Sequence, residues 1–155
     1  MRISLLAIAK TTDKHLDALI QDYTSRLTHY CSFAFKVLEA KVTASMSEAE
    51  QKTIEGALLL QHIPATADCI LLDEHGTQYR SVDFAAMVQK KMAAGRDLVF
   101  VIGGPYGFSE AVYQRANGKM SLSEMTFSHQ MVRLFFVEQL YRAFTILRGE
   151  KYHHE

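Results

Sequence analysis

The residues best suited to hold a ligand follow the apolar run 98–102, where the chain reads Gly103-Gly104-Pro105. Glycines at the end of a buried strand let a ligand approach backbone amides and carbonyls closely. The spacing is not the G-x-G-x-x-G of dinucleotide-binding proteins and no Walker lysine follows, which weakens NAD and ATP as ligands. A purely structural turn is the alternative, but the position after a strand favours a binding site.

A second segment, 122–127, is apolar for a surface loop and has no regular periodicity. It leads directly into a helix that Ser128 can cap. A connection that packs into the core is the alternative to a ligand-binding loop.

The chain's last third carries polar residues at helical spacing, followed by an aromatic and basic tail. His129 and Arg133 lie one turn apart on a common face, and Glu138 and Arg142 are spaced for a helical ion pair. A solvated helix face is the alternative. The tail ends in Tyr152, His153 and His154, types that suit stacking on an unpaired base and contacting phosphate. A docked or frayed end, or a tag remnant, is the other interpretation of this tail.

These residues are positioned by strands that alternate with helices. Apolar runs predict strands near 3–8, 33–37, 69–72 and 98–102 and a brief extended segment at Leu122. Helical periodicity and capping residues predict helices near 13–27, 47–63, 84–92, 109–116 and 128–147. The chain is expected to turn at His75 and Gly76. The fold class is therefore α/β, a mostly parallel sheet with helices on both faces. In such sheets ligands bind at the carboxyl ends of the strands, here the loops after Leu72 and Ile102.

The last helix is apolar around most of its circumference, more than packing on one sheet requires. In so short a chain a second subunit is the natural partner for the excess, so we expect a homodimer through this helix.

Length and composition indicate one soluble globular domain spanning residues 1–155. Its net charge is zero, so any nucleic acid must be bound by a local patch. No window is long and apolar enough to span a membrane, and the short apolar start is interpreted as a strand rather than a signal peptide. Cys31, Cys69 and the histidines lack metal-ligand spacing, so no metal is expected, and the location expected is cytoplasmic.

Taken together, the segments 6–10, 100–105, 122–127, 141–143 and 152–153 resemble the SPOUT methyltransferases, the α/β-knot family. The resemblance is closest to the small bacterial members that methylate N3 of a pseudouridine in 23S ribosomal RNA, and it covers essentially the whole chain. It implies a deep trefoil knot in the C-terminal part, which general rules of chain topology would not predict. It also implies that the substrate is the assembled ribosome.

In that family S-adenosylmethionine binds within the knot loops. The matching cofactor-binding positions are Leu72, Gly103, Gly104, Leu122, Ser123, Glu124, Met125, Thr126 and Phe127. The residues expected to contact RNA, partly across the dimer interface, are His129, Arg133, Arg142, Tyr152, His153 and His154. Relatives commonly have Arg or Lys where this chain has His154.

For catalysis, positioning of the base nitrogen against the methyl group should dominate. The N3 proton must also leave, and His153, Glu138 and His129 are candidates to accept it, with Arg142 and Tyr152 as further catalytic candidates. Two other functions stay open. One is a non-catalytic RNA- or ribosome-binding factor with the same fold, and the other is a nucleotide-using α/β enzyme of another class.

Overall fold

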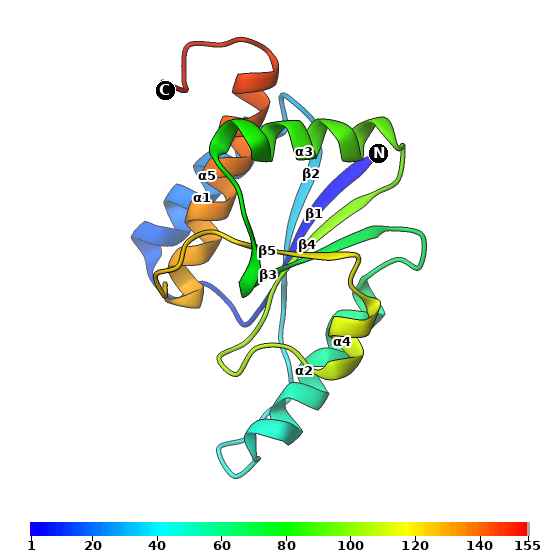
Figure 1. Ribbon diagram of the computed structural model, residues 1–155. Coiled ribbons are helices and arrows are strands. Elements are labelled where there is room, and N and C mark those ends of the chain that lie inside the picture. Colours follow the sequence, from blue (N-terminus) through cyan, green and yellow to red (C-terminus); the bar gives the residue numbers. More distant parts are fainter. Residues whose placement is uncertain (155) are drawn as a thin grey trace.

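Five parallel strands form one sheet in the computed structural model, which describes residues 1–154 (Figure 1). The strand order is β2-β1-β4-β3-β5, and every neighbouring pair is parallel. The strands are β1 (Arg2–Ile8), β2 (Ser32–Leu38), β3 (Asp68–Gln78), β4 (Leu98–Ile102) and β5 (Gly118–Ser121). The predicted parallel α/β sheet is confirmed, with the last strand lying just before Leu122 rather than at it.

Five helices alternate with these strands and cover both faces of the sheet, as predicted. They are α1 (Lys14–Leu27), α2 (Glu48–His62), α3 (Ser81–Ala93), α4 (Glu110–Arg115) and α5 (His129–Leu147). Helices α1, α3 and α5 pack on one face and α2 and α4 on the other (Figure 1). Side-chain oxygens of Asp13, Ser47, Ser109 and Ser128 cap four of the helices, which explains why their starts could be predicted.

The central strands β1 and β4 supply side chains to both cores. Leu5 of β1 and Phe100 of β4 pack with α1, α3 and α5, whereas Leu6 and Val101 pack with α2 and α4. Successive strand residues point to opposite faces. A strand covered by helices on both faces is therefore apolar at every position, and no alternation is visible in its sequence.

The chain does not turn at His75 and Gly76, so that prediction is wrong. Strand β3 continues to Gln78, and its pairing with β5 shifts register, so that Leu72 and Thr77 both lie opposite Met120. The reason is the lack of a side chain at Gly76. A Cβ atom there would lie 2.5 Å from the backbone N and C of Met120, so only glycine lets the two strands approach this closely.

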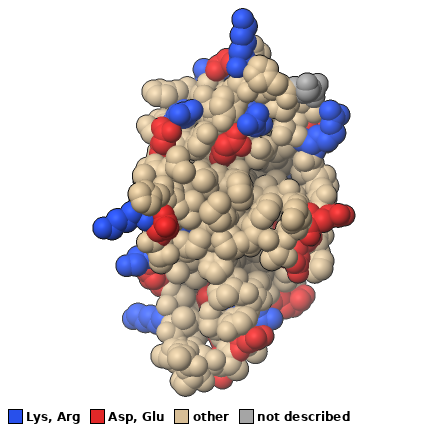
Figure 2. All heavy atoms as spheres, turned by 90° about the vertical axis from the view of Figure 1, so that its left-hand side faces the viewer, with Lys and Arg blue, Asp and Glu red and all other residues tan. Residues whose placement is uncertain are grey.

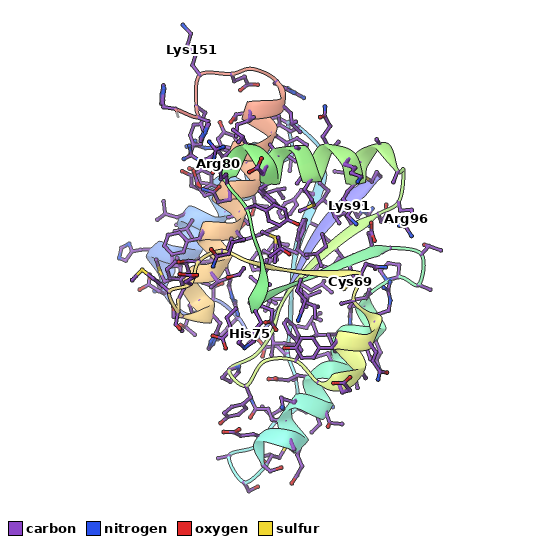
Figure 3. All side chains as sticks on the ribbon, in the orientation of Figure 1. Cys69, His75, Arg80, Lys91, Arg96 and Lys151 are labelled. Carbon is purple, nitrogen blue, oxygen red and sulfur yellow. The ribbon has the colours of Figure 1, made fainter. Side chains whose placement is uncertain are left out.

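Ion pairs stabilise the amino ends of β3 and β4. The buried carboxylate of Asp68 accepts from Lys91 Nζ at 2.8 Å and lies 3.5 Å from an Arg96 nitrogen. Lys91 and Arg96 lie side by side there, away from His75 (Figure 3). The carboxyl ends of the same strands are left to form the candidate site. Among residues 1–154, no helix is long and apolar enough to cross a membrane.

Candidate functional site

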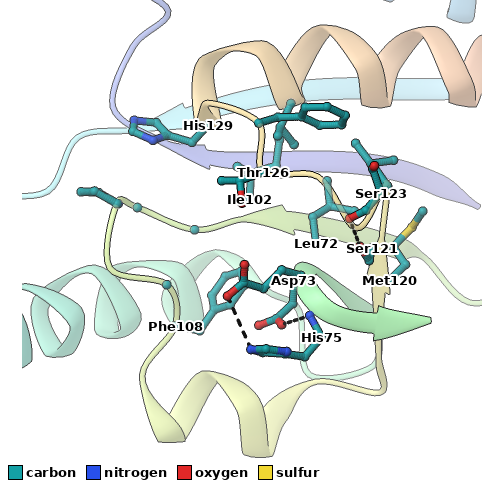
Figure 4. A pocket seen from close by; sticks show the side chains of 18 of the residues that line it. Leu72, Asp73, His75, Ile102, Phe108, Met120, Ser121, Ser123, Thr126 and His129 are labelled. Atoms are coloured by element: carbon teal, nitrogen blue, oxygen red, sulfur yellow. Dashed lines mark hydrogen bonds and ion pairs between the residues drawn. The ribbon is translucent and has the colours of Figure 1, made fainter. Parts of the chain in front are cut away.

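A cavity of about 450 Å³ opens at the carboxyl ends of β3, β4 and β5 (Figure 4). Three segments line it: 72–75 after the buried part of β3, 102–108 after β4, and 120–129 between β5 and the start of α5. The rule that ligands bind at the strands' carboxyl ends predicted the first two. Of the nine predicted cofactor-binding residues, eight line this cavity: Leu72, Gly103, Gly104, Leu122, Ser123, Met125, Thr126 and Phe127.

Glu124 is the exception. It is exposed and is absent from the cavity wall, so its prediction as a cofactor contact is not supported. The reason is local. Ser121 Oγ donates to the carbonyl of Ser123 at 2.8 Å, and the Met125 amide donates to Ser123 Oγ at 3.0 Å. These two bonds form a tight bend, and Glu124 lies at its outer side.

The glycine loop after β4 is a tight turn in which the Gly107 amide donates to the Gly104 carbonyl at 3.1 Å. Behind the turn lies Glu55 of α2, which is only 3% exposed. A Cβ atom at Gly104 would lie 2.4 Å from Glu55 Oε1, so the glycine makes room for this carboxyl group. Glu55 Oε2 accepts from Gln51 Nε2 at 3.2 Å, whereas Oε1 has no partner within residues 1–154. Burial raises the pKa of Glu55.

The sequence analysis predicted a ligand site in the loop after Leu72 but named none of the acidic residues of this part of the wall. Asp73 accepts a short hydrogen bond from the phenol of Tyr113 and another from the His75 amide at 2.8 Å. Burial, followed by the bond to Asp73, raises the pKa of Tyr113, so its hydroxyl stays protonated and donates. Asp73 and Glu74 directly follow the apolar run 69–72, and that position was the available signal.

A second polar cluster lies near the other end of α5, with Glu138 at its centre. Arg142 donates to Glu138 Oε1 at 2.6 Å, which confirms the predicted helical ion pair. The phenol of Tyr152 donates to the same oxygen at 2.9 Å, and a nitrogen of Arg142 lies 3.2 Å from His153 Nδ1. The tail is therefore docked on α5. His154 is exposed beyond it.

Tyr152 is held by aromatic contacts as well. Its ring lies edge-on to Tyr141, with centroids 4.8 Å apart, and its hydroxyl lies 3.2 Å from that of Tyr23 on α1. Burial and the hydrogen bonds to Tyr23 and Glu138 raise the pKa of Tyr152. The phenol is therefore a donor at neutral pH and is unsuited to accept a proton from a substrate.

The prediction that Arg133 contacts RNA is wrong for this fold, because its side chain is completely buried. Its guanidinium donates to the carbonyl of Ile8 at 2.7 Å, to Thr11 Oγ1 at 3.1 Å and to the carbonyl of His129 at 3.3 Å. Arg133 thus ties α5 to the end of β1. His129, one turn earlier, lines the cavity.

The cavity and the Glu138 cluster do not meet within one chain. Val132, the last residue of α5 in the cavity wall, and Glu138 are six residues apart on this helix, which corresponds to roughly 9 Å at the helical rise of 1.5 Å per residue. No group of three or more His, Cys, Asp or Glu side chains in the described part of the chain is arranged to hold a metal ion. Glu138 and the side chains bonded to it therefore lie outside the wall of this cavity.

Comparison with known proteins identifies the family. Residues 1–153 match the family described as "Predicted SPOUT methyltransferase". Similar proteins include Ribosomal RNA large subunit methyltransferase H of Flavobacterium johnsoniae, 57% identical over the full length of both chains. Proteins with the same name are 54% identical in Christiangramia forsetii, over 99% of both chains, and 50% identical in Bacteroides thetaiotaomicron, over the full length of both. A cavity between strand ends and the 120–129 segment, together with a match over almost the whole chain, leads to one conclusion: this protein belongs to the SPOUT methyltransferase family.

Proposed function

We propose that this methyltransferase transfers a methyl group from S-adenosylmethionine to N3 of a pseudouridine in 23S ribosomal RNA, within the assembled ribosome. The observation that carries the proposal is the cavity at the carboxyl ends of β3, β4 and β5, whose wall contains eight residues selected from the sequence as cofactor contacts. The names of the full-length relatives support the RNA substrate. The resemblance noted in the sequence supports the choice of nucleotide, the ribosomal context, the C-terminal knot and a single domain over residues 1–155.

The cavity fits such a donor in size and chemistry. Its volume of about 450 Å³ falls within the roughly 300–1,000 Å³ of small-molecule sites. Gly103 and Gly104 offer backbone groups at close range, Leu72 and Phe127 offer apolar surface, and the carboxylate of Asp73 suits a positively charged ligand. When bound, S-adenosylmethionine supplies a methyl group activated by a positive sulfur.

The protein's own residues must then hold the base nitrogen in line with that methyl group and exclude water. They must also take up the N3 proton. Glu138 and His153 are our candidates, because each has a side-chain acceptor in the polar cluster. Arg142 contacts both Glu138 and His153, and Tyr152 contacts Glu138. These contacts hold the two candidates in place.

Neither of the two proton-accepting candidates, Glu138 and His153, lines the cavity of its own chain. We propose a homodimer in which one copy's tail meets the other copy's cavity. The surface supports this arrangement. The face formed by α1 and α5 has a broad central area without charged side chains (Figure 2), and Leu19, Met131 and Phe135 on these helices are 38–49% exposed. Burying such surface favours association.

RNA would be bound near the tail and the cavity mouth. The Arg142 side chain is 24% exposed, so its guanidinium can reach a phosphate or base. His129, Tyr152, His153 and His154 complete the proposed RNA contacts. Because the chain has zero net charge, these local contacts must supply the salt-dependent part of binding. A protein acting on ribosomes would work in the cytoplasm.

The test is transfer of labelled methyl from S-adenosylmethionine to assembled ribosomes that lack the modification, with the nucleoside identified by mass spectrometry. Methylated pseudouridine is the expected product. Tight donor binding without transfer would mean that the substrate is wrong. Absence of donor binding would favour the non-catalytic ribosome-binding factor, and tight ATP or NAD binding would favour the nucleotide-using enzyme.

A further inference from the structure

A second cavity, of about 290 Å³, lies beside the first and has no role in the function proposed above. It shares one wall with the first cavity, formed by 120–122 and Phe127. Its other side is formed by Tyr79 and Ser81 at the start of α3 and by Phe135 and Gln139 on α5. A molecule in this second cavity would therefore lie directly against the wall of the donor cavity.

The apolar part of the second cavity consists of flat rings. Phe127 and Phe135 are in contact, with centroids 5.0 Å apart, and Tyr79 lies 6.4 Å from the Phe84 ring. Tyr79 is 38% exposed, so its ring is accessible from outside, whereas Phe135 lies on the face that we propose is covered in the dimer. Exposed aromatic rings beside a pocket are surfaces on which an unpaired base can stack.

The polar part of the second cavity is the carboxamide of Gln139, whose orientation is fixed by its neighbours. Its nitrogen donates to Glu138 Oε2 at 2.9 Å, and its oxygen accepts from Ser81 Oγ at 2.9 Å. Because a carboxylate can only accept, the amide NH₂ must face Glu138. The amide nitrogen keeps a second N–H that can donate, and the amide oxygen keeps a second lone pair that can accept.

A carboxamide held this way presents a donor beside an acceptor, the complement of the N1–H and C2=O edge of a pseudouridine, and pairing at that edge leaves N3 free to face the methyl group. We propose that the second cavity binds the target base, an unpaired pseudouridine, stacked on Tyr79 and hydrogen-bonded to Gln139 through N1–H and C2=O. This inference rests on the proposed function and specifies where its substrate lies. Through Gln139 the bound base would be linked directly to Glu138, one of the two candidate proton acceptors.

The test compares Gln139→Leu with Gln89→Leu, the same change at an exposed position of α3. We expect Gln139→Leu to lower kcat/KM for ribosomes by about ten- to a hundredfold, the usual effect of losing a hydrogen-bonding group that reads a substrate. Its Kd for S-adenosylmethionine, measured by calorimetry, and its mass by light scattering should match those of Gln89→Leu. Equal kcat/KM values in the two variants would overturn the proposal.

Two further results would also overturn it. A weakened Kd for S-adenosylmethionine in Gln139→Leu would make the second cavity part of the donor site, and loss of the dimer would mean that a second copy fills it. A binding readout separates this proposal from the proposed function. With S-adenosylhomocysteine bound, a single-stranded oligonucleotide containing pseudouridine should shift the methyl NMR signals of Met120 and Leu122 in the wild type and not in Gln139→Leu. That result does not require methyl transfer, so it stands even if ribosomes prove to be the wrong substrate.

Discussion

Replacing Gly76 by alanine should disrupt the strand pairing on which the cavity depends. The added Cβ would lie 2.5–2.6 Å from the N, Cα and C atoms of Met120, whereas carbon atoms in contact are normally about 3.5–4.0 Å apart. The atoms in the way are backbone atoms, so no side-chain rotation can relieve the clash. Strands β3 and β5 must separate by about 1 Å, which strains the pairs that Leu72 and Thr77 make with Met120.

The expected cost is about 3 kcal/mol, the upper part of the range for overpacked sites. For a protein of this size, 1 kcal/mol corresponds to roughly 2–4 °C in Tm, so Gly76→Ala should melt roughly 6–12 °C below the wild type. Because Met120 lines both cavities, the variant should also bind S-adenosylmethionine more weakly.

Gly118→Ala is the matched control, because Gly118 lies in the same strand pair and its added Cβ would have no atom within 4 Å. We expect it to stay within about 0.5 kcal/mol of the wild type. Urea unfolding at one fixed protein concentration measures both variants, since a dimer's stability depends on concentration. Our reasoning would be refuted if Gly76→Ala unfolded at the same urea midpoint as Gly118→Ala.

Three further predictions follow from the buried and half-buried polar groups. Arg133→Met should lower the free energy of unfolding by about 1–3 kcal/mol, because backbone carbonyls lose their donor. The salt dependence of ribosome binding should stay unchanged, and a shallower salt slope in filter binding would contradict burial of this residue. Glu138→Ala removes the acceptor of Tyr152, so limited proteolysis should cut the C-terminal tail about tenfold faster, as expected for a loss of about 1.4 kcal/mol, and an unchanged cleavage rate would show that the tail is held by other contacts. Burial raises the pKa of both Cys31 and Cys69 to about 11, so about one thiol in a thousand is ionised at pH 8. The rate of alkylation by iodoacetamide, followed by mass spectrometry, should rise about tenfold for each pH unit above 8. Rapid labelling at pH 8 would contradict the raised pKa values.

The sequence allowed much of the fold to be predicted because its signals are local. The runs 69–72 and 98–102 are apolar without interruption, as strands covered on both faces must be. Serines and an aspartate before the helices mark their starts. Where the local signal was ambiguous the prediction was wrong: a histidine and a glycine at 75–76 usually mark a turn, and only the close passage of Met120 shows why the strand continues there.

The candidate site could be predicted in part for the same reason. Residues of the first cavity directly follow buried strands, and the carboxyl ends of parallel strands meet at one edge of the sheet. Helical spacing correctly paired Glu138 with Arg142, because neighbours one turn apart are fixed by the helix itself. The same spacing could not show that Arg133 lies inside the protein, since an arginine is usually exposed unless distant carbonyls satisfy it.

The sequence by itself determined the α/β class, the helix caps, the loops that line the first cavity and the family resemblance, since each depends on residues close together in the chain. Only the tertiary structure decided which polar groups are available for chemistry. It buries Arg133 against the end of β1 and sets Glu55 behind Gly104. These outcomes depend on contacts between residues tens to more than a hundred positions apart. A local sequence pattern does not show which distant donor will bond to which acceptor.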